Sequence, residues 1–275
     1  MPPRTKLVVA GLSLLVVAGT LACTRYAIHR LSGDRSRATA TTHEPVQGLG
    51  AGPLRLDPAA AHTHRLLLDA PALARLSESA RLRTPAFRRV LARADEAASA
   101  AVASGYQGFE WADALANLAL AWQATGDARY GEAAVRYLRA LLDDRFVVGD
   151  GKGGADVVTH DSGYGIRTFG AYTALGYDWL REAPGMDPAL RNHALERLTQ
   201  WLAWYGTQGY LRDRPIANYY WGYLTTLSFA GLAASGESAA ADGWLKQARG
   251  ALSESVLPTF RDDLGGGGWP EGWQY

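Results

Sequence analysis

The chain has 275 residues and a mass of 29.6 kDa, which suits one large domain or one domain with processing segments. Its composition, 48% hydrophobic and 20% charged with a net charge of +1, excludes a disordered polyampholyte and a multispanning membrane protein. The near-neutral balance argues against a dedicated nucleic-acid binder. The single cysteine excludes a disulfide framework and a zinc site built from several thiolates.

The N-terminal segment has the pattern of an export signal. Two basic residues precede an apolar or small run at 7–22, which is shorter than the roughly 20 residues that a membrane-spanning helix needs. Residues 1–23 are therefore predicted to be a cleaved export signal, a lipoprotein signal that ends at Cys23, or an uncleaved anchor. Residues 24–65, rich in Ser, Thr, Gly, Pro and Ala, are predicted to be a flexible linker. We expect a periplasmic, secreted or lipid-anchored protein.

From Leu73 onward the apolar residues follow the 3.6-residue period of helices. The helical segments are separated by short breaks with helix-stop and capping residues at 125–127, 184–188 and 235–238. Helices joined by such tight turns are antiparallel neighbours, so we predict an all-α domain of about four helical hairpins, arranged as an arc or toroid. The two clearest stripes are Tyr130, Ala133, Ala134, Tyr137, Leu138, Leu141 and Leu142, and Leu190, His193, Ala194, Leu198, Trp201, Leu202 and Tyr205.

Two glycine-rich segments interrupt this regularity, at 149–165 and 264–275. The second reads LGGGGWPEGWQY and places aromatic residues beside flexible backbone. Loops that a rigid scaffold positions are where function concentrates, so both segments are candidate site loops.

The candidate functional residues lie at helix ends and in these loops. The chain has no Gly-x-Ser-x-Gly, phosphate-loop or His-Glu-x-x-His motif. Asn218 is either a helix N-cap or a functional carboxamide, and Arg167 is either a surface ion-pair residue or an anion clamp. His160 is either a solvated loop histidine or a base, whereas His193, on an apolar face, is predicted to be structural. Aromatic residues near breaks are candidate platforms for sugar rings: Trp221, Trp269 and Trp273.

At this point the chain resembles a known family. The run NYYWGYLTTLSFAGLAASGE and the ending GGWPEGWQY are similar to those of heparinase II/III-like and alginate-lyase-like polysaccharide lyases. DSGYGIRTFGAYTALGYDWL and ALANLALAWQATGDARYGEAAVRYL carry the same resemblance, which covers residues 66–275. It implies an incomplete (α/α) toroid and β-elimination across a glycosidic bond of a uronic-acid polysaccharide.

The resemblance also implies roles for individual residues. Asn218 would neutralise the uronate carboxylate, and Tyr275 would be the acid/base. Many family members have His after the Asn; here Tyr219 stands in that place, so the base is Tyr219, His160 or Tyr275. The expected substrate-binding residues are Tyr164, Arg167, Trp221, Trp269, Glu271 and Trp273.

The expected partner is an acidic polysaccharide or oligosaccharide. We expect no nucleic acid, no cofactor and no metal ligands, and membrane contact only through the N-terminal segment. Since the sequence stops inside the ending motif, it is expected to be a fragment of a longer protein or a degenerate member, with its own activity left open. Two other functions remain: a glycoside hydrolase on an (α/α) barrel that uses Asp161 and Glu271, or a non-catalytic carbohydrate-binding surface protein.

Overall fold

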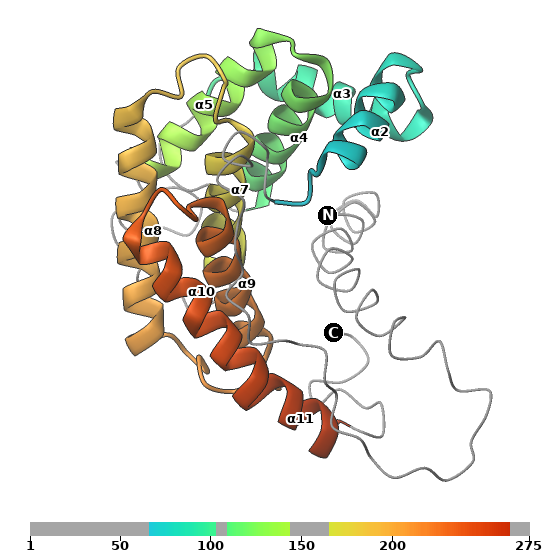
Figure 1. The fold of residues 1–275 in the computed structure, drawn as a ribbon. Coiled ribbons are helices and arrows are strands. Elements are labelled where there is room, and N and C mark those ends of the chain that lie inside the picture. The colour runs from blue at the N-terminus through green and yellow to red at the C-terminus, as the bar shows by residue number, and fades with distance from the viewer. Residues whose placement is uncertain (1–65, 103–108, 144–164, 265–275) are drawn as a thin grey trace, which may run out of the picture. The chain divides into compact units, whose positions relative to one another are not determined.

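The computed structural model describes residues 66–102, 109–143 and 165–264, which all belong to one compact unit, Pro58–Tyr275. Every element in these described residues is a helix (Figure 1). None of the described helices is long and apolar enough to cross a membrane. The helices are α2 (Ala70–Arg81), α3 (Pro85–Ser99), α4 (Phe109–Thr125), α5 (Ala128–Asp143), α7 (Ala171–Trp179), α8 (Pro188–Gln208), α9 (Asn218–Ala233), α10 (Ala239–Ala251) and α11 (Leu257–Asp262). The π-helical segments η2 (Ile166–Gly170) and η3 (Leu252–Val256) lead directly into α7 and α11.

Tight turns join successive helices into antiparallel hairpins. Gly126, Gly185 and Gly236 have φ angles of 69°, 85° and 78°, the left-handed conformation that ends a helix at low cost only with glycine. Asp187 then caps α8, because its carboxylate accepts a 2.8 Å hydrogen bond from the Leu190 amide. The three predicted turns are therefore confirmed.

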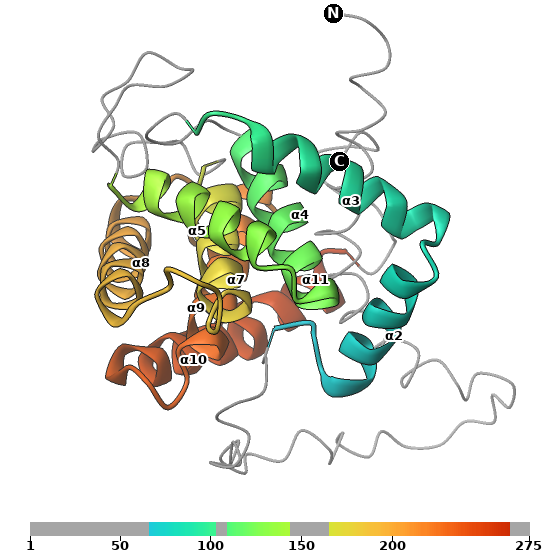
Figure 2. The same cartoon turned by 90° about the horizontal axis from the view of Figure 1, so that it is seen from above.

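The hairpins stack as two rows of helices. Helices α4, α7 and α9 form an inner row, in which α7 contacts both of the others, and α5, α8 and α10 each pack on the inner helix that precedes them (Figures 1 and 2). Eight of the nine residues of α7 are buried, as expected for a helix enclosed on all sides. The all-α prediction is confirmed. A pair of one inner and one outer helix is the repeating unit of an (α/α) toroid. The incomplete toroid itself stays a prediction.

The predicted apolar stripes form the core. In the stripe on α5 all residues but Tyr137 are buried, and in the stripe on α8 all but His193. The side chain of His193 is 36% exposed, with Nδ1 3.9 Å from Oδ1 of Asp143. His193 therefore lies at the edge of the apolar stripe, close to Asp143 at the end of α5, and not inside the apolar face.

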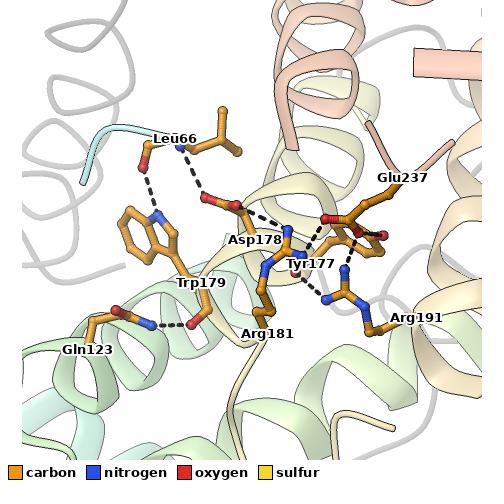
Figure 3. Close-up of polar contacts among 8 residues, drawn as sticks. All are labelled: Leu66, Gln123, Tyr177, Asp178, Trp179, Arg181, Arg191 and Glu237. Atoms are coloured by element: carbon orange, nitrogen blue, oxygen red, sulfur yellow. Dashed lines mark hydrogen bonds and ion pairs between the residues drawn. The ribbon is translucent and has the colours of Figure 1, made fainter. Parts of the chain in front are cut away.

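A polar network joins the C-terminal end of α7 to three other parts of the chain (Figure 3). The Glu237 carboxylate, in the turn between α9 and α10, accepts hydrogen bonds from Arg181, from Arg191 on α8, and from the Tyr177 hydroxyl at 2.6 Å. The guanidinium of Arg191 also lies over the Tyr177 ring, 4.2 Å from its centroid. The Glu237 side chain is only 23% exposed, so these donors replace most of its water.

The same end of α7 binds the backbone of Leu66, the first residue that the structure describes. Asp178 accepts a 3.1 Å hydrogen bond from the Leu66 amide, and the Trp179 indole donates to the Leu66 carbonyl at 2.9 Å. Gln123, near the end of α4, donates to the Trp179 carbonyl. The ends of two inner helices and the incoming backbone are therefore tied together (Figure 3).

The network shifts the pKa of two of its members. Burial by itself would raise the pKa of Glu237, but the hydrogen bonds from Tyr177 and Arg181 and the charges of Arg181 and Arg191 outweigh it, and the pKa is lowered. Burial, and then the hydrogen bond to Glu237, raises the pKa of Tyr177, which keeps its proton as a donor. A carboxyl with a lowered folded-state pKa contributes stability above its unfolded pKa and loses that contribution as the pH falls through the folded one.

Replacing Glu237 with Ala is expected to lower the free energy of unfolding by about 2 kcal/mol at neutral pH, because Arg181 and Arg191, whose side chains are 14% and 16% exposed, lose their shared carboxylate. The difference from wild type should shrink as the pH falls below about 4.3, where the wild-type carboxylate also takes up a proton. Urea denaturation at a series of pH values measures both effects.

The matched control is Glu78→Ala, which removes the pair with Arg81, both of whose side chains are more than half exposed. No measurable change in the free energy of unfolding is expected there, because solvent screens an exposed ion pair. Equal losses for the two variants would contradict the stabilising role of Glu237.

Candidate functional site

Helix α9 begins at the predicted position, with Asn218 as its first residue. The N-cap is Ala217, whose backbone is extended (φ −106°, ψ 137°) and whose methyl group accepts no hydrogen bond. Asn218 is therefore not the N-cap, and its half-buried carboxamide is not explained by capping. The N-cap interpretation is therefore wrong, and the functional role of the carboxamide stays a prediction.

One face of α9 meets the π-helical segment η2. A Cβ placed on Gly222 would lie 2.7 Å from Cβ of Arg167, and the Thr226 hydroxyl donates a 2.8 Å hydrogen bond to the Ile166 carbonyl. Residues four apart lie on the same helix face. Because Asn218 precedes Gly222 by four residues and Thr226 by eight, it lies on the face of α9 that packs against η2.

Arg167 links the starts of two inner helices. Its backbone and Cβ pack on Gly222 of α9, and its guanidinium carbon lies 5.6 Å from the ring centroid of Phe109, the first residue of α4. Phe109 is 51% exposed, so this cation–π contact lies at the surface end of the inner helices. The structure thus brings the predicted residues Arg167 and Asn218 to the same end of the inner row.

The three helix starts point the same way. Arg167 packs on Gly222, and Gly170, three residues later, packs on Thr226, four residues later, so η2 and α9 run parallel. Phe109 lies against Arg167, and Leu115 against Gly176, so α4 runs parallel to both. The N-terminal ends of α4, η2 and α9 therefore gather around Arg167. Helix N-termini carry partial positive charge, and together with a guanidinium they favour an anion such as a carboxylate.

Two further polar residues of this end were not predicted from the sequence. Asp113 lies one turn after Phe109 on α4, and Tyr172 lies on α7 within electrostatic reach of its carboxylate. Burial, with a smaller contribution from Asp113, raises the pKa of Tyr172 to about 12, so the phenol is protonated at neutral pH. Burial also raises the pKa of Asp113, against the charge of Arg93. The signal in the sequence was an acidic residue directly before the mostly apolar run 114–122 of α4.

Tyr219 and Trp221 fix the loop that precedes α9. The Tyr219 ring lies edge to face with that of Tyr210, with centroids 5.1 Å apart. The Trp221 indole donates a 2.9 Å hydrogen bond to the Pro215 carbonyl, and its ring contacts that of Phe260 on α11. Trp221 therefore has a structural role, and its expected role as a sugar platform stays a prediction.

Residues 92–256 match the model of a protein family described as alginate lyase. The match covers more than half of the sequence. The chain belongs to the alginate lyase family. A search of curated proteins gave no match.

Membership of the alginate lyase family confirms the resemblance seen in the sequence and supports a polysaccharide-lyase-like function. The matched range includes the starts of α4, η2 and α9, and thus Phe109, Arg167 and Asn218. Within the described residues there is no group of three His, Cys, Asp or Glu side chains placed to hold a metal ion.

The other predicted site residues lie outside the described residues. They are His160, Asp161, Tyr164, Trp269, Glu271, Trp273 and Tyr275. Their predicted roles stay predictions, as does the convergence of Asn218 and Tyr275 on one hollow.

Replacing Gly222 with Ala is expected to lower the free energy of unfolding by about 1–3 kcal/mol, because the new methyl group would overlap Cβ of Arg167 and push η2 away from α9. If this end of the inner row binds substrate, the variant also loses substrate binding. Urea denaturation and a ligand titration measure the two effects.

Gly243→Ala is the matched control, since a Cβ at this exposed position in the middle of α10 meets nothing within 4 Å. There the change should stabilise the protein by up to about 1 kcal/mol, through helix propensity. A Gly222 variant that behaved like the Gly243 variant would show that η2 and α9 do not pack this closely.

Proposed function

We propose that the protein is an exported lyase that cleaves a uronic-acid polysaccharide by β-elimination. Membership of the alginate lyase family supports the reaction class. The observation that carries the proposal is the placement of Arg167 and Asn218 on the packed faces of η2 and α9, where three helix N-termini gather. A carboxylate is the substrate group that this combination of charge and donors suits.

The chemistry of β-elimination explains the residue types. The C5 proton of a uronate is very weakly acidic while the adjacent carboxylate is charged. The Asn218 carboxamide and the Arg167 guanidinium would neutralise this carboxylate and stabilise the enolate that develops as the proton leaves. Donors that strengthen as charge develops accelerate the step itself and do not only bind the ground state.

A base and an acid complete the reaction. The base takes the C5 proton, the C4–C5 double bond forms as the C4–O bond breaks, and the departing glycosidic oxygen receives a proton. Tyr219, beside Asn218 on the first turn of α9, is the candidate among the described residues. His160 and Tyr275 remain the alternatives. Tyr275 would serve as both base and acid if it alone reaches the sugar.

The full chain incubated with a uronate polymer is expected to release products with a conjugated double bond, measured as a rise in ultraviolet absorbance. Asn218→Ala and Arg167→Ala should each lower kcat by about 10²–10³, the usual cost of removing one preorganised donor to a developing oxyanion. Helical circular dichroism should not change.

Asn192→Ala on α8 and Arg75→Ala on α2 remove the same chemical groups from exposed positions and should keep full activity. Wild-type rates in an Asn218 or Arg167 variant would remove that residue from the mechanism. New reducing ends without a rise in ultraviolet absorbance would show a hydrolase and contradict the lyase proposal. Binding of the polymer without new reducing ends or absorbance would show a non-catalytic binding protein.

A further inference from the structure

The loop between α8 and α9, residues 209–217, displays an aromatic side chain to solvent. Tyr210 is 57% exposed, although it directly follows Gly209, the C-cap of α8. Its ring is not loose, because it lies edge to face with Tyr219 at an interplanar angle of 85°. Such contacts fix the orientation of a ring as well as its position. Tyr219 is the neighbour of Asn218, so the exposed ring of Tyr210 is held beside the first turn of α9.

The backbone of the same loop is strained next to this ring. Leu211 has a φ of 51°, the left-handed region that an L-residue with a side chain rarely adopts. Its carbonyl accepts a 3.1 Å hydrogen bond from the Arg214 amide, which keeps the turn closed. Strain of this kind persists only where surrounding contacts determine the conformation, as they also do at Leu67 and Arg83 in other turns.

The far end of the loop is fixed by the same helix. The Pro215 carbonyl accepts the hydrogen bond from the Trp221 indole, two residues along α9 from Tyr219. Both ends of the loop are therefore held by aromatic side chains of the first turn of α9. Because this turn also carries Asn218, the position of Tyr210 is set by the helix that carries the candidate carboxylate donor.

We propose that Tyr210 is a binding platform for a pyranose ring of the substrate, beside the sugar whose carboxylate Asn218 and Arg167 bind. This rests on the proposed function and adds a binding residue to the same site. The apolar C–H face of a sugar suits the exposed face of an aromatic ring, and a platform held rigid loses little entropy on binding. Trp221 is less suited to the task, because its N–H and its ring already contact Pro215 and Phe260.

The test is binding and turnover of uronate oligosaccharides of increasing length by Tyr210→Ala and Tyr210→Phe variants of the full chain. Tyr210→Ala should weaken binding of a tetrasaccharide by about 3- to 10-fold, as expected for one lost ring contact. A uronate monosaccharide, whose single ring fills the Asn218 position and does not reach the platform, should be affected less. Tyr210→Phe should bind like wild type, because the ring face and not the hydroxyl makes the contact.

Leu82→Ala is the matched control, because Leu82 is equally exposed at 57% and lies in the turn between α2 and α3. It should bind every oligosaccharide like wild type. Calorimetric titration measures binding without turnover, and circular dichroism shows that Tyr210→Ala keeps its helices.

The results separate the two proposals. Wild-type tetrasaccharide affinity in Tyr210→Ala, or an equal loss for monosaccharide and tetrasaccharide, would overturn the platform, whatever the reaction. A length-dependent loss without any conjugated product would support the platform and reject the lyase. If the wild-type chain bound no uronate oligosaccharide, both would fall.

Discussion

The contact of Arg167 with the bare backbone of Gly222 is what the candidate site depends on. Because position 222 has no side chain, η2 approaches α9 closely enough for the Thr226 hydroxyl to bind the Ile166 carbonyl. That approach places the stem of Arg167 on the face of α9 that carries Asn218, and leaves its guanidinium to reach the ring of Phe109. The absence of a side chain at position 222 therefore lets the starts of α4, η2 and α9 come together. Among the described residues, these helix starts and Arg167 form the positively charged group that we assign to a substrate carboxylate.

The two ends of the inner helices differ in their polar contacts and in their exposure to solvent. At the C-terminal end of α7, the carboxylates of Glu237 and Asp178 hold two arginines and the Leu66 backbone in a network with little solvent. Helix C-termini carry partial negative charge, so arginines are also favoured there by the backbone. The N-terminal end instead has half-buried polar groups and exposed aromatic rings. A rigid far end lets the near end present exposed groups, which is the usual division between scaffold and binding site.

The first turn of α9 shows how one short motif serves several purposes. Asn218 faces η2, Tyr219 orients the ring of Tyr210, and Trp221 holds the Pro215 carbonyl and packs on Phe260. Tyr219 and Trp221, which the sequence offered as candidate site residues, therefore also hold neighbouring residues in position. Membership of the alginate lyase family supports a polysaccharide substrate. Under the proposed function, a uronate polymer would offer a carboxylate to Asn218 and Arg167 and sugar rings to the exposed aromatic surface.

The sequence by itself determined the helices, their turns and the start of α9. Helix periodicity, glycine at the left-handed positions and Asp187 as a cap are local properties, so they can be read over a few residues. Asn218 and Arg167 were candidates from their places at helix ends, and the resemblance to a family gave them their expected roles. The sequence did not indicate the pairing of Phe109 with Arg167, of Asp113 with Tyr172, or of Glu237 with Tyr177, which is 60 residues away. Only the tertiary structure decided these pairs, because they depend on which faces of distant helices meet and in which register, and that is set by contacts such as Gly222 on Arg167.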